Sequence, residues 1–178
     1  GRPAAKSGRY TGPTPKIDWP DWATRTVNIQ RQLTADDFRI AAAPGRTTMN
    51  AAVIRPFHWH PVFSTMELPV ADGAVQRLDS ENLTKFAIVD RFSGEARTSR
   101  MFWRGCGPRD AESALACSVG HDKHNIWCVG SSDAAMALAV NTLAAQQGGW
   151  VLVHNGAVTA TVRFEIGGLM SARPAEAV

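Results

Sequence analysis

Short apolar segments bounded by turn residues recur along this chain, and they constrain its fold more than any other feature. Segments rich in Val, Ile, Phe, Trp and Ala predict strands at residues 48–55, 65–70, 85–90, 99–104, 114–119 and 125–130. Residues 26–29 form a shorter candidate strand, and Ala71-Asp72-Gly73 predicts a hairpin turn. A succession of this kind is typical of a sheet-dominated fold.

One segment has the composition of a longer helix. Ser131-Ser132-Asp133 is a typical N-cap cluster, residues 134–147 are rich in Ala and Leu, and Gly148-Gly149 ends the pattern. A single helical turn is predicted after Thr34. Asn155-Gly156 then predicts a β-hairpin between residues 150–153 and 158–162. We therefore expect an α+β fold with a mixed, largely antiparallel sheet, few helices and a C-terminal β-hairpin, and no (β/α)8 barrel in this chain.

Charge and composition narrow the class of protein. Of the 178 residues, 44% are hydrophobic and 20% are charged, which is enough for a core. Residues 1–31 carry six Lys/Arg against two acids, whereas the rest carries 13 against 14. We interpret residues 1–20 as a basic, Pro/Gly-rich connector and residues 21–178 as the domain, with no nucleic-acid partner. No apolar run is long enough for a bilayer, and three cysteines without a CxxC motif favour a reduced, cytoplasmic setting.

The five polar residues His121-Asp122-Lys123-His124-Asn125 lie between two apolar, strand-like segments. They place several donors and acceptors at one end of the predicted sheet, where sites tend to be built. The two imidazoles could bind a metal, or could donate and accept protons near neutral pH. The spacing agrees equally well with a hydrogen-bonded structural turn, because the third ligand usual in zinc sites is missing.

Other candidate residues are weaker. In a strand, His58-Trp59-His60 would place both imidazoles on one face, but packed or exposed histidines beside two prolines are favoured. Asp90-Arg91 is either a substrate clamp or, as favoured, an ion pair that closes a turn. His154 is expected to face solvent. Gly167-Gly168 would permit a close backbone approach or a positive φ.

Several of these segments together resemble one known family. The segments are residues 85–91, the run Ser118-Val119-Gly120-His121-Asp122-Lys123-His124-Asn125, residues 129–141 and the end Gly167-Gly168-Leu169-Met170-Ser171. They are similar to the C-terminal domain of bacterial and archaeal adenine deaminases, and the resemblance extends to residues 22–27 and 33–38. Gly120 and Lys123 stand where the family usually has Ala and Ser, and Gly105-Cys106-Gly107-Pro108 replaces a Gly-Phe-Gly-type stretch.

The resemblance implies a part of a metal-dependent amidohydrolase that converts adenine and water to hypoxanthine and ammonia. It implies supporting catalytic roles for His121, Asp122, His124 and Asn125, and substrate binding by Ser118 and Arg91. A divalent metal (manganese, iron or zinc) would be held mainly by a barrel domain or subunit, with His121 and His124 as possible additional ligands. The expected partners are that barrel, adenine or a related aminopurine, and further copies in a homo-oligomer, with no membrane.

Two interpretations of the whole chain stay open. In the first, the chain completes an active site whose metal ligands lie on the barrel, and it would be inactive alone. Pro174-Ala175-Glu176 looks like the first turn of an unfinished helix, so we expect a fragment, a split subunit or a domain separated from its continuation. In the second, the chain is a non-catalytic module that binds a purine or mediates assembly.

Overall fold

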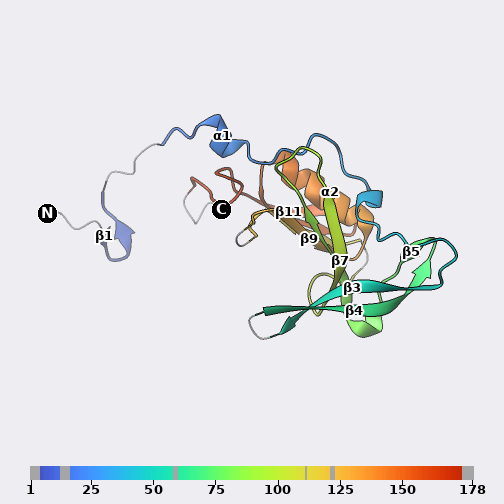
Figure 1. Ribbon diagram of the computed structural model, residues 1–178. Coiled ribbons are helices and arrows are strands. Elements are labelled where there is room, and N and C mark those ends of the chain that lie inside the picture. Colours follow the sequence, from blue (N-terminus) through green and yellow to red (C-terminus); the bar gives the residue numbers. More distant parts are fainter. Residues whose placement is uncertain (1–4, 13–16, 58–59, 111, 121–122, 174–178) are drawn as a thin grey trace.

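A computed structural model describes residues 5–12, 17–57, 60–110, 112–120 and 123–173, with the backbone alone at residues 56, 57 and 60. Its main feature is a nine-stranded sheet with the strand order β11-β10-β8-β9-β6-β7-β3-β4-β5 (Figure 1). The strands are β3 (Thr48–Phe57), β4 (His60–Ala71), β5 (Ala74–Val75), β6 (Leu83–Val89), β7 (Thr98–Arg104), β8 (Ala114–Cys117), β9 (Ile126–Gly130), β10 (Gly149–His154) and β11 (Ala157–Arg163).

The sheet is antiparallel except where β3 runs parallel to β7 through the pairs Val53–Phe102 and Ile54–Trp103. Only two α-helices occur in the described part of the chain, α1 (Asp21–Thr24) and α2 (Asp133–Ala145), with 3₁₀ turns η1 (Ala35–Asp37) and η2 (Asp79–Glu81). These strands do not close into a barrel. The predicted α+β class and largely antiparallel sheet are therefore confirmed, including the terminal hairpin of β10 and β11.

Helix α2 covers one face of the sheet over β8, β9 and β10 (Figure 1). It begins as predicted, because the Ser132 side chain accepts a hydrogen bond from the Ala135 N–H. Alternate residues of the central strands point toward it, and Ala87, Ala116 and Cys128 are fully buried there with Leu143 of the helix. Small side chains at these positions allow the helix to lie close to the sheet.

A second, smaller core lies at the other end of the sheet, where β3, β4 and β5 meet β7. It contains the buried residues Ala51, Val53, Leu68, Val75, Leu83 and Phe102. The β3–β4 pair is a long hairpin that extends away from the body (Figure 1). The predicted turn at Asp72-Gly73 is confirmed between β4 and β5, with both residues at positive φ.

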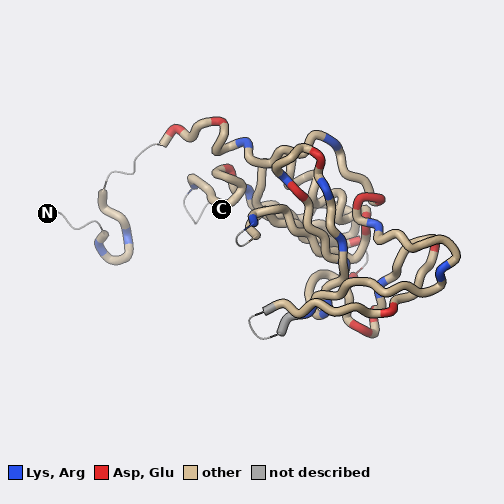
Figure 2. The backbone as a smooth tube through the Cα atoms, viewed as in Figure 1, with Lys and Arg blue, Asp and Glu red and all other residues tan. Residues whose placement is uncertain are grey.

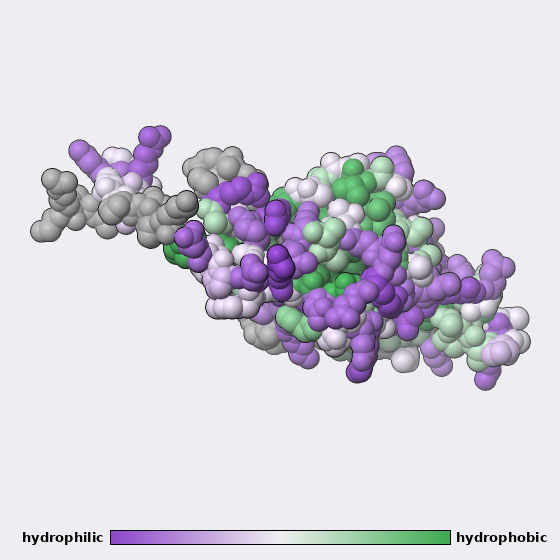
Figure 3. All heavy atoms as spheres, turned by 90° about the horizontal axis from the view of Figure 1, so that it is seen from above, coloured by the Kyte–Doolittle hydropathy of each residue, from purple (hydrophilic) through white to green (hydrophobic). Residues whose placement is uncertain are grey.

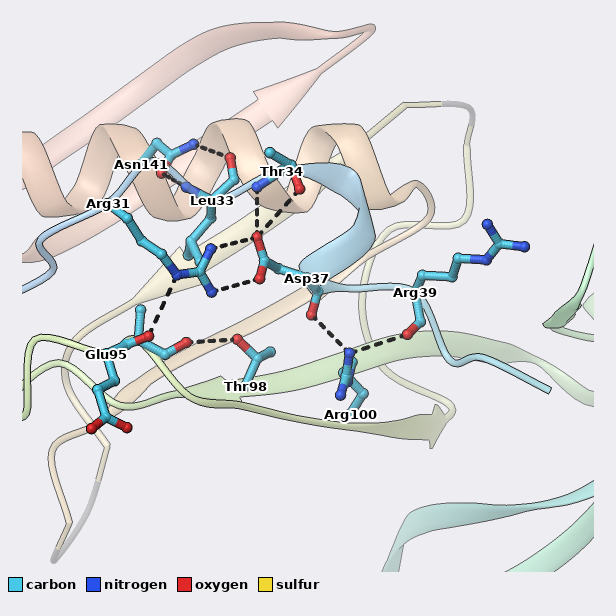
Figure 4. A network of polar contacts seen from close by, with 10 residues as sticks. Arg31, Leu33, Thr34, Asp37, Arg39, Glu95, Thr98, Arg100 and Asn141 are labelled. Atoms are coloured by element: carbon cyan, nitrogen blue, oxygen red, sulfur yellow. Dashed lines mark hydrogen bonds and ion pairs between the residues drawn. The ribbon is translucent and has the colours of Figure 1, made fainter. Parts of the chain in front are cut away.

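The segment between α1 and β3 runs across the helix-covered side and is fixed there by polar contacts (Figure 4). The Asn141 side chain of α2 accepts a hydrogen bond from the Leu33 N–H and donates one to the Leu33 carbonyl, at 2.9 and 2.8 Å. The Arg31 guanidinium binds the Asp37 carboxylate with two hydrogen bonds. Thr34 and Asp37 form a capping box, which confirms the predicted helical turn as η1.

The short strand predicted at residues 26–29 is wrong. Within this segment only Ile29 makes a strand-type bridge, to Gly94. The Val27 backbone is instead bound by the Gln147 side chain at the end of α2, through its N–H at 3.1 Å and its carbonyl at 3.2 Å. The Gln147 side chain thus forms the hydrogen bonds that a neighbouring strand would otherwise form with Val27. A long-range contact of this kind cannot be predicted from the local sequence pattern.

The N-terminal segment lies apart from the body and contains a small hairpin of β1 (Ala5–Lys6) and β2 (Arg9–Tyr10) (Figure 1). Basic and acidic residues are interspersed along the body rather than gathered on one side (Figure 2). The surface seen in Figure 3 likewise carries hydrophobic patches between hydrophilic side chains. None of the described helices has the length and apolarity needed to span a bilayer.

Candidate ligand pocket on the uncovered sheet face

A pocket of about 350 Å³ lies on the sheet face opposite α2. Its floor consists of large apolar side chains from the central strands: Phe86 and Ile88 of β6, Trp103 of β7 and Trp127 of β9. The strand register explains why these side chains lie together. Ile88 is paired with Trp127, and Trp103 is paired with Thr84, which lies on the same face of β6 as Phe86. The Phe86 and Trp103 rings meet edge to face at 4.9 Å between centroids.

Two loops form the walls of this pocket. The connection from β7 to β8 contributes Cys106, and the connection from β8 to β9 contributes Val119, Gly120, Lys123, His124 and Asn125. The first loop is attached to the sheet because the Thr84 hydroxyl donates to the Cys106 carbonyl. It also lies so close that a Cβ on Gly107 would be 3.1 Å from Val129 Cβ.

The second loop begins with a local turn around Val119. The Val119 N–H donates to Cys117 Sγ at 3.1 Å, and the Trp127 indole N–H donates to the Val119 carbonyl at 3.0 Å. These bonds end the strand at Cys117, two residues before the predicted boundary. Farther along, the His124 N–H donates to the Gly120 carbonyl at 2.9 Å, with His124 itself at a φ of 51°. The loop is therefore turned back toward the floor of the pocket.

Three side chains that line the pocket carry buried polar atoms without a hydrogen-bond partner in the described structure. They are the Trp103 indole nitrogen Nε1, His124 Nδ1 and Asn125 Oδ1. An unsatisfied buried polar atom costs about 1–3 kcal/mol, so such atoms are normally paired. The three atoms are one N–H donor, one amide acceptor and one imidazole nitrogen.

Two of the predicted catalytic residues, His124 and Asn125, are thus brought to the pocket, while His121 and Asp122 lie outside the described residues. His58 and Trp59 of the HxH motif also lie outside them, and the motif's metal prediction stays a prediction. Among the described residues no group of three or more His, Cys, Asp or Glu side chains could hold a metal ion. These residues do not make a metal centre by themselves.

Ser118 and Arg91, predicted to bind substrate, meet at the Gly167-Gly168 segment instead of the pocket. The Ser118 hydroxyl is fully buried, accepts from the Gly149 N–H at 2.7 Å and donates to the Gly168 carbonyl. Arg91 Nη1 donates to the Gly167 carbonyl at 3.0 Å and to the Thr26 hydroxyl at 3.2 Å. The described contacts of both side chains are with the protein, and substrate binding by them stays a prediction.

Burial lowers the pKa of Arg91, whose side chain is only 2% exposed and has no carboxylate partner in the described structure. Its guanidinium also lies 4.8 Å from the Phe92 ring centroid. The expected Asp90–Arg91 ion pair is not formed, because Asp90 instead accepts from the Phe92 N–H at 2.9 Å. The predicted positive φ at Gly167 and Gly168 is confirmed, and a Cβ on Gly168 would lie 2.3 Å from Arg91 Nη1.

The prediction that His154 faces solvent is confirmed. His154 is half exposed and pairs through Nδ1 with the Asp110 carboxylate at 2.9 Å, away from the pocket. All three cysteines are free. Burial raises the pKa of Cys117 to about 11, and the pKa of the fully buried Cys128 is raised further, so neither thiol is poised for reaction.

Sequence reasoning missed the pocket floor and Cys106. Trp127 of the predicted strand 125–130 is only partly buried and lines the pocket. The available signal was period-two alternation, which places Phe86 and Ile88 on the face opposite Ala87 and Val89. Cys106 gave no signal, because its position depends on how the β7–β8 loop folds over the sheet.

Comparison with known proteins identifies the family of this chain. The family model described as adenine deaminase C-terminal domain matches residues 63–178. The chain is 68% identical over its full length to 28% of adenine deaminase 1 of Bradyrhizobium sp. (strain ORS 278). With adenine deaminase 2 of Bradyrhizobium diazoefficiens it shares 69% identity; the match covers 96% of this chain and 27% of that protein. With the adenine deaminase of Moorella thermoacetica it shares 38% identity; the match covers all of this chain and 30% of that protein.

The protein is therefore an α+β domain of the adenine deaminase type, with an apolar pocket on its open sheet face. It belongs to the adenine deaminase C-terminal domain family. The chain spans less than a third of the length of the curated relatives it matches. Three of the residues at which the sequence was expected to depart from the family, Cys106, Gly120 and Lys123, line the pocket.

Proposed function

We propose that this chain is the C-terminal domain of an adenine-deaminase-like hydrolase and completes an active site whose metal ligands lie on a barrel contributed by the rest of the protein. The reaction is hydrolysis of adenine by water to hypoxanthine and ammonia, as the names of the relatives suggest. A divalent metal held by the barrel (manganese, iron or zinc) would supply activated water. The observation that carries the proposal is the set of unpartnered polar atoms at Trp103, His124 and Asn125.

These atoms suit a flat, nitrogen-rich ring. The floor of Phe86, Ile88 and the two indoles supplies apolar contact for a planar heterocycle. The Trp103 N–H can donate to a ring nitrogen, and Asn125 Oδ1 can accept from an amino group or ring N–H. His124 Nδ1 can donate or accept according to its tautomer. These residues bind and orient the purine and exclude water, while the chemistry takes place at the barrel.

The test uses a chimaera in which this chain replaces the matching 178 residues of the Bradyrhizobium sp. adenine deaminase 1. Ammonia release from adenine is measured for the parent chimaera and for the variants His124→Ala and Asn125→Ala. Loss of one substrate hydrogen bond costs about 1–3 kcal/mol, so we expect kcat/KM to fall about 5- to 150-fold in each variant.

The matched control is His154→Ala, which removes another imidazole ring that is exposed and paired with Asp110 outside the pocket. It should keep the parental kcat/KM. The proposal is contradicted if His124→Ala and Asn125→Ala behave like the control. His121→Ala, tested alongside, decides whether the supporting role predicted for that residue is real.

A second candidate function is a purine-binding module without catalysis. It is favoured by one observation: the three unpartnered atoms all belong to this chain, so the pocket can hold a ligand without a barrel. Titrating the 178-residue chain with adenine while recording tryptophan emission tests it directly, because Trp103 and Trp127 line the pocket. A saturable change that is lost in Asn125→Ala, together with a chimaera that releases no ammonia, would favour this function over the first.

A further inference from the structure

The sheet face opposite α2, here named the open face, is apolar although no element of the described chain packs over most of it. Its residues follow from the strand register, since paired residues point the same way. From β10 to β7 they include Leu152, Leu115, Val129, Phe86, Trp127 and Ile88. The open face continues to Ile54 of β3 and Phe63 of β4 through the pairs Ile54–Trp103 and Ile54–Phe63.

The exposure of these side chains is unusual for a sheet face in contact with water. Ile88 is 36% exposed, Leu152 39% and Phe63 64%. An antiparallel sheet with one solvated face normally alternates apolar and polar residues. The open-face positions of β6 to β10 instead hold no Asp, Glu, Lys or Arg at all. Val129 and Phe86 between them are buried, and the exposed apolar side chains on either side mark an interaction surface.

Two edge-to-face aromatic pairs of the described residues also lie on the open face. Trp127 and Trp150 meet at 5.3 Å between ring centroids, and Phe86 and Trp103 meet at 4.9 Å. Aromatic side chains anchor protein interfaces because they bury a large apolar area with little loss of conformational entropy. The candidate pocket lies in the same surface, lined by Phe86, Trp103 and Trp127.

We propose that the open face docks against the portion of an adenine deaminase that lies outside this chain, and that this portion presents an apolar surface which closes the pocket. The identity of the partner rests on the proposed function. Two observations select it: the relatives are more than three times as long as the matched region, and the open face is continuous with the pocket. A docked surface would close the pocket lined by Trp103, His124 and Asn125 without covering α2.

Hydroxyl-radical footprinting tests the proposal residue by residue. The 178-residue chain and the full-length Bradyrhizobium chimaera are oxidised under the same conditions without substrate. We expect Leu152, Ile88 and Phe63 to be oxidised about fivefold or more slowly in the chimaera, because a buried interface core loses most of its contact with water. Val158 is the matched internal reference: it is 39% exposed like Leu152, but its register with Val153 places it on the α2 side.

Paired substitutions supply the second measurement. Leu152→Asp should lower the melting temperature of the chimaera without lowering that of the isolated chain, whereas Val158→Asp should affect both equally little. Equal oxidation of the open face in the two proteins overturns the proposal. Protection of the isolated chain that grows with its own concentration also overturns it, because the occupant would then be a second copy. Neither readout involves ammonia release, so an inactive but protected chimaera would refute only the proposed function.

Discussion

The two faces of the central sheet are built from the same strands but from different kinds of side chain. The face under α2 is lined by small or branched residues such as Ala87, Val89 and Ala116, all completely buried. The open face carries Phe86, Trp103 and Trp127, together with polar atoms that have no hydrogen-bond partner among the described residues. The residues of the first face are buried by contacts within the chain. The second face keeps exposed apolar area and polar atoms that are free to form hydrogen bonds. The stability of the domain and its proposed function would then depend on opposite sides of one sheet.

The largest loss of unfolding free energy is expected for a substitution at Gly149, where the backbone leaves no room for a side chain. Gly149 begins β10 at a φ of 117°, and a Cβ there would lie 1.8 Å from the Val162 carbonyl oxygen. Gly149→Ala should therefore lower the free energy of unfolding by about 4 kcal/mol or more, because both strain and a backbone clash act on it. Urea denaturation followed by circular dichroism measures the loss.

Gly120→Ala is the control in the pocket loop. A Cβ on Gly120 would meet no heavy atom closer than 3.4 Å, at Asn125 O, and its φ is not positive. Its free energy of unfolding should change by no more than about 0.5 kcal/mol. Equal losses in the two variants would contradict the described backbone.

The next effect compares leucines on the two faces. Leu143 of α2 is fully buried and Leu152 of the open face is 39% exposed. Leu143→Ala should cost about 3 kcal/mol of unfolding free energy, because it leaves a cavity under the helix. Leu152→Ala should cost under about 1 kcal/mol in the isolated chain. A comparable cost at both positions would mean that the open face is already covered.

A smaller effect concerns the polar contacts of the segment beside α2. The Arg31 hydrogen bonds hold the pKa of Asp37 at about 2, below its ordinary 3.8. A carboxylate with a lowered folded-state pKa stabilises the fold above its unfolded pKa, and that contribution is lost as the pH falls from about 4 to about 2. Asp37→Asn should cost about 1 kcal/mol at pH 7, discounted because the Arg31 side chain is 45% exposed.

The pH dependence of the unfolding free energy distinguishes the contribution of the Arg31–Asp37 ion pair from acid destabilisation by other groups. Unfolding free energies of the parent and of Asp37→Asn, measured by denaturation from pH 7 downward, should converge between pH 4 and pH 2. A constant difference down to pH 2 would show that the ionised carboxylate is not what Asp37 contributes.

The least perturbing test uses the three thiols. Cys106 is exposed in the pocket wall, whereas Cys117 and Cys128 are buried on the sheet with raised pKa values. A thiol reagent should therefore modify one cysteine rapidly in the folded chain and the others only after unfolding, with mass spectrometry placing the modification on Cys106. Rapid modification of Cys128 would contradict the burial of this residue between the sheet and α2.

Much of the fold could be predicted from local pattern, because turn residues and period-two alternation are local properties. The β10–β11 hairpin follows from Asn155-Gly156, and α2 follows from its Ser132 cap. The spatial strand order could not be predicted, since it places β8 between β9 and β10 and makes β3 parallel to β7. Such neighbours depend on long-range contacts that no local segment records.

The candidate site was predictable only in part for the same reason. His124 and Asn125 were found because their polar run interrupts an apolar pattern, and the structure places both at the pocket. Arg91 and Ser118 belong to the resemblance, yet their described contacts hold the Gly167–Gly168 segment. A residue shared within a family can thus serve the backbone as well as the ligand, and only the contacts distinguish the two.

The most direct test of this separation is a pair of measurements on the chimaera, comparing His124→Ala with Leu143→Ala. We predict that His124→Ala lowers kcat/KM for adenine about 5- to 150-fold and leaves the melting temperature unchanged. Leu143→Ala should lower the melting temperature and leave kcat/KM per folded molecule unchanged. If His124→Ala keeps full activity, or if Leu143→Ala loses activity while folded, function does not reside on the open face.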